Sequence, residues 1–141
     1  MRKKKHGIDI ERLKHRIVKA AKYLPIKLIV LFGSAVKSTY GQLSDIDIGI
    51  LFNNKPSLKQ EEILLLNFTK RLPEFSLDIV ILNHISPLLG YFISRDGICL
   101  YARNASEWHD FRLRLLRNYR DTKKFRKRHE DFIKNKLSQV V

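Results

Sequence analysis

The sequence predicts an α/β (α+β) fold in which helices flank a small mixed β-sheet. Short apolar runs rich in Ile, Leu and Val alternate along the chain with longer segments whose apolar residues recur at helical spacing. The connections between the apolar runs differ in length, so that some neighbouring strands are expected to be antiparallel and others parallel. Together these two observations favour a mixed sheet over an all-helical or all-β fold.

Size and composition indicate one globular domain of 141 residues, with a core of about 26–102 and helical ends at 9–24 and 106–136. Hydrophobic residues make up 44% and charged residues 30%, which excludes a disordered chain and a membrane protein. Cys99 is the single cysteine, so no disulfide framework is expected. No apolar run approaches the length of about 20 residues that a bilayer requires. We therefore expect a cytoplasmic protein without membrane contact.

The net charge of +14 is concentrated at the two ends of the chain. Residues 1–27 carry a net charge of +8 and residues 103–141 carry +7, whereas the middle is almost neutral. Such ends can attract a nucleic acid, a nucleoside triphosphate or an acidic protein partner, and they are equally typical of solvated helix faces.

In the first half of the chain the pattern predicts one helix followed by two strands. A helix is expected over 9–24, capped by Asp9 and ended by Pro25. The continuous apolar run 27–32 predicts a strand buried on both faces, closed by a glycine. Residues 44–52 alternate aspartate with isoleucine, which predicts a second strand with one core-facing side.

In the second half, Ser57 is expected to cap a helix that extends to about residue 72. A third strand is predicted over 75–82, a short helix after Ser86, and a last short strand over 99–102. From about residue 106 onward, apolar residues at helical spacing predict a long basic C-terminal helix.

Three aspartates are expected to meet at one edge of this sheet. Ten residues separate Ser34 from Asp45, fewer than a parallel crossover needs, so the first two strands should be antiparallel. Gly33 and Ser34 would then lie beside Asp45 and Asp47. The next connection contains a helix, which suits a right-handed crossover between parallel strands. Asp78, near the start of the third strand, is therefore expected to join the same site.

Converging carboxylates repel one another and are costly to bury unless a cation compensates them. Ligands that offer only oxygen suit Mg²⁺ or Mn²⁺. Two such ions, about 4 Å apart, can activate an attacking oxygen and stabilise a leaving pyrophosphate. We expect Asp45 and Asp47 to bridge two Mg²⁺ ions, and Asp78 to complete the site and assist deprotonation of an acceptor hydroxyl.

The loop before these aspartates is expected to bind the triphosphate of a nucleotide. Gly33 allows the backbone to approach closely, and the Ser34 hydroxyl can hydrogen-bond the outer phosphates. Lys37 is a further candidate phosphate contact, although a loop lysine is usually solvated.

The run LFGSAVKSTYGQLSDIDIGIL, followed later by the strand LDIVIL, resembles the DNA polymerase β-like nucleotidyltransferase superfamily and its minimal nucleotidyltransferase branch. The segment NHISPLLGYFISRDGICLYA is similar to the corresponding segment of MntA-type antitoxins, and the resemblance covers about residues 26–126. Ala35, Val36 and Lys37 stand where the family often has arginines, so triphosphate contacts are expected to differ here.

The resemblance implies a polymerase β-like nucleotidyltransferase fold and ATP as the substrate. It also implies a HEPN-domain toxin as the partner, which the enzyme silences by transferring AMP to a tyrosine. Two alternatives remain at the level of sequence. One is a non-catalytic module that binds RNA or a protein partner through its basic ends, and the other is a nucleotidyltransferase that acts on a small hydroxylated molecule.

Overall fold

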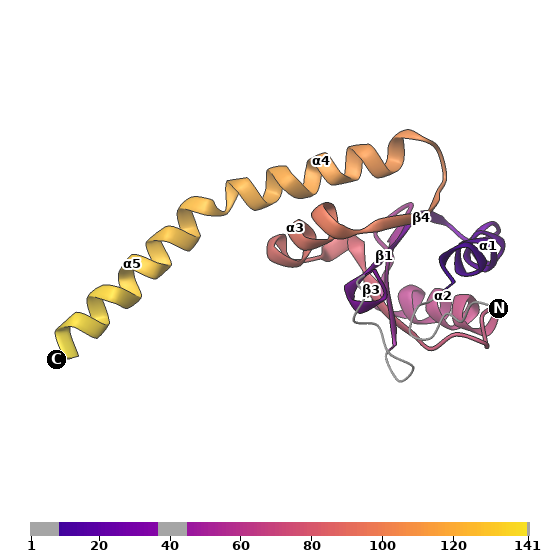
Figure 1. Ribbon diagram of the computed structural model, residues 1–141, viewed down its shortest axis with the longest axis horizontal. Helices are drawn as coiled ribbons and strands as arrows, with labels where there is room; N and C mark the ends of the chain where they lie inside the picture. Colours follow the sequence, from indigo (N-terminus) through magenta and orange to yellow (C-terminus); the bar gives the residue numbers. More distant parts are fainter. Residues whose placement is uncertain (1–8, 37–44, 141) are drawn as a thin grey trace, which may run out of the picture.

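A computed structural model describes residues 9–36 and 45–140 of the chain. Within these ranges, helices and strands follow one another in the predicted order (Figure 1). In chain order they are α1 (Ile10–Ala21), β1 (Ile26–Phe32), η1 (Gly33–Ala35), β2 (Ile46–Phe52), α2 (Leu58–Lys70), β3 (Leu77–Ile81), η2 (Leu82–His84), α3 (Pro87–Asp96), β4 (Ile98–Ala102), α4 (Ser106–Asp121) and α5 (Lys123–Val140).

Side chains at the helix starts explain where three of these helices begin. Asp9 accepts a hydrogen bond of 3.2 Å from the Arg12 amide at the start of α1. Ser57 and Gln60 form a capping box at the start of α2. Ser86 caps α3 directly before a proline in the first turn. The capping roles predicted for Asp9 and Ser57 are confirmed.

The sheet is mixed, with strand order β3-β2-β1-β4. β1 pairs antiparallel with both β2 and β4, whereas β2 and β3 are parallel. The helix α2 provides the long crossover between these two parallel strands, as the lengths of the connections predicted. Because β1 and β2 are antiparallel and β2 and β3 are parallel, the end of β1 and the starts of β2 and β3 lie at the same edge of the sheet.

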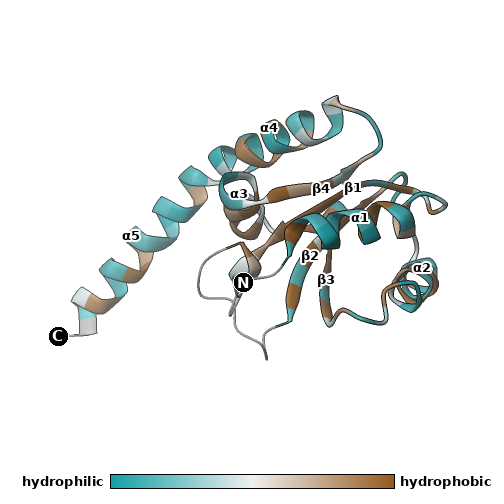
Figure 2. Ribbon diagram, turned by 45° about the vertical axis from the view of Figure 1, so that its right-hand side comes forward, coloured by the Kyte–Doolittle hydropathy of each residue, from teal (hydrophilic) through white to brown (hydrophobic). Residues whose placement is uncertain are grey.

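Helices cover both faces of the sheet (Figure 2). Leu13 and Ile17 of α1 and Phe68 of α2 are buried against one face in the larger apolar cluster. Ile93 of α3 and Phe111 of α4 belong to the smaller cluster on the other face. β1 contributes to both clusters, which agrees with the strand buried on two faces that its continuous apolar run predicted.

The C-terminal helical region differs from the single long helix that the sequence predicted. Thr122 separates α4 from α5, and its amide and its hydroxyl both donate to the Tyr119 carbonyl, at 3.2 and 2.7 Å. These bonds to a residue three positions earlier tighten the last turn of α4, which ends the regular helix. α5 then extends to Val140, beyond the predicted end near residue 136, and projects away from the sheet (Figure 1).

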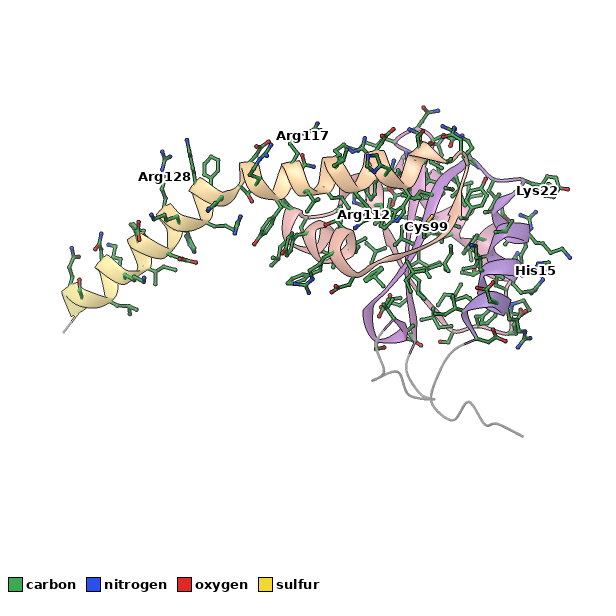
Figure 3. All side chains as sticks on the ribbon, turned by 45° about the horizontal axis from the view of Figure 1, so that its top comes forward. His15, Lys22, Cys99, Arg112, Arg117 and Arg128 are labelled. Atoms are coloured by element: carbon green, nitrogen blue, oxygen red, sulfur yellow. The ribbon has the colours of Figure 1, made fainter. Side chains whose placement is uncertain are left out.

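Arg112 attaches α4 to α3, because its guanidinium donates a 3.0 Å hydrogen bond to the Ser94 carbonyl. Figure 3 shows Arg112 between these two helices, whereas Arg117 and Arg128 lie on the outer side of α4 and α5. Arg117 and Arg128 therefore belong to an exposed basic surface, whereas Arg112 makes a structural contact. Among the helices of the described ranges, none is long and apolar enough to cross a membrane.

Replacing Phe68 with Ala should lower the free energy of unfolding by about 3–5 kcal/mol, because it leaves a cavity in the larger cluster. Phe68 is 1% exposed, whereas Leu66 on the same helix is 57% exposed. Leu66→Ala is the matched control, with an expected change within about 0.5 kcal/mol. Urea unfolding of both variants measures the difference, and equal losses would contradict this assignment of the core.

Candidate active site

The pairing register of the sheet brings two aspartates side by side. Asp47, in β2, is the Cα partner of Asp78 in the parallel strand β3 and of Phe32 at the end of β1. Gly33 follows Phe32 directly, so the turn after β1 lies at the same edge of the sheet. Asp45 immediately precedes β2 at this edge. The structure thus brings Gly33, Asp45, Asp47 and Asp78 together, as the sequence predicted.

Ser76 is a site residue that the sequence analysis missed. Its hydroxyl donates a hydrogen bond to Oδ1 of Asp45, and its carbonyl accepts one of 2.8 Å from the Ile46 amide. The parallel register could have identified it, since Ser76 precedes Asp78 by the same two residues that separate Asp45 from Asp47. Ser76 therefore orients the exposed carboxylate of Asp45.

The half-buried carboxyl group of Asp47 is electrostatically strained. Burial raises the pKa of Asp47 above its ordinary value, and the charge of Asp78 together with a hydrogen bond to Asp78 raises it further. The charge of Asp45 adds a smaller effect in the same direction. This position disfavours the charged carboxylate, so a cation at this edge would stabilise the charged form of Asp47.

Gly33 forms a tight turn at the end of β1, next to Asp47. It has a φ of +74° and is the one described residue with a positive φ. A Cβ atom at this position would overlap the carboxylate of Asp47, so the turn requires glycine both for its conformation and for space. Gly33 and Ser34 begin η1, in which the Val36 amide bonds to the Gly33 carbonyl at 3.2 Å.

Ser34 and Lys37 are the other two residues that the sequence predicted to contact phosphate. Ser34 is half-buried in the turn after β1, directly following Gly33. Lys37 lies outside the described residues, so its predicted phosphate contact has no structural account.

Among residues 9–36 and 45–140, no three His, Cys, Asp or Glu side chains are placed to hold a metal ion as they stand. The carboxylate of Asp45 bonds to Ser76 instead.

These groups form an oxygen-rich edge next to a glycine turn. Carboxylate oxygens without nitrogen or sulfur ligands suit Mg²⁺ or Mn²⁺. Backbone close to a glycine turn can approach the phosphates of a nucleotide without interference from a side chain. The arrangement is chemically suited to transfer of a phosphoryl or nucleotidyl group.

Known proteins share this fold and sequence pattern. Protein adenylyltransferase MntA of Aphanizomenon flos-aquae (strain 2012/KM1/D3) is 29% identical over 140 residues, which cover 93% of this chain and 92% of that protein. A crystal structure of a toxin-antitoxin with AMP-PNP contains a chain that aligns with a TM-score of 0.70 and 23% identity. The alignment covers 85% of this chain and 97% of that chain.

A second solved structure is a tri-AMPylated Shewanella oneidensis HEPN toxin in complex with MNT antitoxin. It aligns with a TM-score of 0.67 and 21% identity, covering 88% of this chain and 98% of the matched chain. Identities this low show a common fold. The family described as "Polymerase beta, Nucleotidyltransferase" matches residues 14–106, which contain all four strands of the described sheet and the three aspartates at its edge. The chain therefore belongs to the polymerase β nucleotidyltransferase family.

Proposed function

We propose that this nucleotidyltransferase is an MntA-type antitoxin that transfers AMP from ATP to a tyrosine hydroxyl of a HEPN toxin. The observation that carries the proposal is the register that pairs Asp47 with Asp78 beside the turn at Gly33. The name of the Aphanizomenon relative, protein adenylyltransferase MntA, supports the reaction, because the similarity extends over nearly the whole of both chains.

The toxin-antitoxin complexes support the nucleotide and the partner. One contains AMP-PNP, an analogue of ATP, and another contains an AMPylated HEPN toxin. Both align over most of this chain, so a partner of the same class is compatible with its shape. The acceptor in our proposal is consequently a protein hydroxyl.

Asp45, Asp47 and Asp78 are proposed to hold two Mg²⁺ ions, or Mn²⁺ in their place. The chemistry of the donors fits, since all are carboxylates and the pKa of Asp47 is raised by burial and by the neighbouring charges. Asp45 is exposed, so its carboxylate can exchange the hydrogen bond from Ser76 for a cation at little cost. When bound, the ions would supply charge stabilisation to the phosphates and activate the attacking oxygen.

The protein groups have separate roles in the proposed reaction. The acceptor hydroxyl oxygen forms a bond to the α-phosphorus of ATP, and the bond to the pyrophosphate oxygen breaks. Asp78, exposed at the start of β3, assists removal of the hydroxyl proton. Gly33 and Ser34 bind the outer phosphates, which become the pyrophosphate product. The products are AMP-tyrosine in the partner and free pyrophosphate.

The direct test incubates this chain with ATP, Mg²⁺ and a purified HEPN-domain toxin protein. Mass spectrometry of the HEPN protein should detect added AMP on tyrosine. Binding of the two proteins without any AMP transfer would contradict the proposal. AMP transfer to small hydroxylated molecules, with none to the protein, would favour the other nucleotidyltransferase function.

Asp45→Asn and Asp47→Asn should each reduce the rate of AMP transfer by at least about a hundredfold, because each removes an anionic ligand from the site. Neither change should lower the unfolding midpoint of the metal-free protein, since each relieves repulsion among the carboxylates. Asp110→Asn, at an exposed position of α4, is the matched control and should retain full activity. Wild-type rates in both site variants would refute the assignment.

Ser34→Ala should raise the KM for ATP about tenfold or more, because a hydrogen bond to a charged phosphate contributes about 1.5–3 kcal/mol. Gly33→Ala should have a larger effect, since the added Cβ overlaps the carboxylate of Asp47 and strains the backbone. Ser106→Ala, at an exposed serine of α4, provides the control. Steady-state kinetics measure all three variants, and unchanged ATP kinetics at both positions would exclude this turn from the site.

A further inference from the structure

Helix α5 carries large apolar side chains that no part of the described chain covers. Every residue from 127 to 139 is exposed. The exposed apolar residues are Phe125 at 70%, Phe132 at 58%, Ile133 at 43% and Leu137 at 63%. Figure 2 shows these brown segments on a helix that stands apart from the sheet. Contiguous exposed apolar residues of this kind are typical of interaction surfaces.

The preceding helix, α4, also carries an apolar stripe, but that stripe is mostly buried. Phe111, Leu115 and Tyr119 recur every four residues on α4, where Phe111 and Leu115 are buried in the smaller apolar cluster. On α5, beyond the break at Thr122, Phe132 follows Phe125 by seven residues and Leu137 follows Ile133 by four, so these residues form a separate apolar stripe on one side of that helix. The stripe on α4 is covered by α3 and the sheet. The stripe on α5 has no such cover among the described residues.

Contacts of Arg126 fix the orientation of α5 relative to α4. The guanidinium of Arg126 donates to the hydroxyl of Tyr119 at 3.0 Å and to its carbonyl at 3.1 Å. The same guanidinium lies 4.0 Å from the centre of the Tyr119 ring, which in turn stacks on Tyr91 of α3 at 4.3 Å. Arg126 thus connects α5 to the body of the enzyme, and a molecule bound along α5 has a defined position relative to α3.

The net charge of α5 indicates which kind of molecule binds along this helix. Residues 123–140 contain seven Lys or Arg residues and two Asp or Glu residues, a net charge of +5. Two copies of this helix in contact would repel each other. A nucleic acid would neutralise the charge but leave the large apolar side chains without a partner. A protein with an apolar groove bordered by acidic residues would cover the apolar side chains of α5 and complement its positive charge.

We propose that the apolar stripe of α5 docks into an apolar, acid-rimmed groove of the protein that accepts the nucleotide. The inference rests on the proposed function, because the occupant is the acceptor protein. Asp47 alternates along β2 with Ile46 and Ile48, which face α1 and α2, so its side chain belongs to the face covered by α3 and α4. α5 leaves the molecule beyond α3 on this side (Figures 1 and 2). A protein held by α5 is therefore on the side of the catalytic carboxylates.

The test changes Phe132, Ile133 and Leu137 together to Ser in the full chain. Affinity for the HEPN-domain protein, measured by calorimetry, should fall about a hundredfold, which corresponds to about 2.8 kcal/mol. The KM for that protein should rise, while the KM for ATP and the kcat at saturating HEPN protein stay unchanged. Leu58, Ile63 and Leu66 on α2 are 83%, 50% and 57% exposed, so their joint change to Ser is a matched control that should alter none of these values.

The outcomes separate this proposal from the proposed function. Wild-type AMP transfer with an unchanged KM for the HEPN protein in the α5 variant would overturn the docking surface and leave the reaction intact. Binding that requires α5, without AMP transfer, would support the surface and refute the reaction. A wild-type dimer that the α5 variant loses would assign the stripe to a second copy. Tight RNA binding lost in the same variant would assign it to nucleic acid, and either result would overturn the proposal.

Discussion

The parallel pairing of β2 with β3 places two aspartate side chains beside each other at the edge of the sheet. Asp47 and Asp78 are direct Cα partners, and Asp47 is also half-buried. This position is unfavourable for the protein alone, as the raised pKa of Asp47 indicates. Repulsion of this kind is tolerated at a site that binds cations, and the proposed mechanism depends on it. A neutral residue at either position would remove the reason for a metal.

On our proposal, the topology around this pair brings the nucleotide to it. The antiparallel hairpin of β1 and β2 returns the chain so that Gly33 lies against Asp47, and the crossover through α2 places Asp78 on the other side. The two apolar clusters hold these strands from both faces. Helices α4 and α5 then extend the enzyme beyond the sheet, and on our proposal they carry the partner to the same side.

Much of this arrangement could be predicted from the sequence, because it follows from connection lengths and from alternation. The short connection before Asp45 predicts that the first two strands are antiparallel. The helical crossover before Asp78 predicts that the second and third strands are parallel. The role of Ser76 was missed, since a serine before a strand has no distinctive pattern until the register is known. The break at Thr122 depends on hydrogen bonds to Tyr119 that compete with the helix. The exposure of α5 could not be predicted either, because apolar residues recur at the same helical spacing whether the stripe that they form is buried or exposed.

The most direct measurement of the central claim is the pKa of Asp47, followed by NMR through its side-chain carboxyl carbon, without and with Mg²⁺. In the metal-free protein the pKa should lie above the ordinary range of aspartate, because burial and Asp78 favour the neutral form. Saturating Mg²⁺ should lower the pKa of Asp47, since a bound cation stabilises the charged carboxylate. An ordinary pKa in the metal-free protein, or one that saturating Mg²⁺ leaves unchanged, would contradict the account.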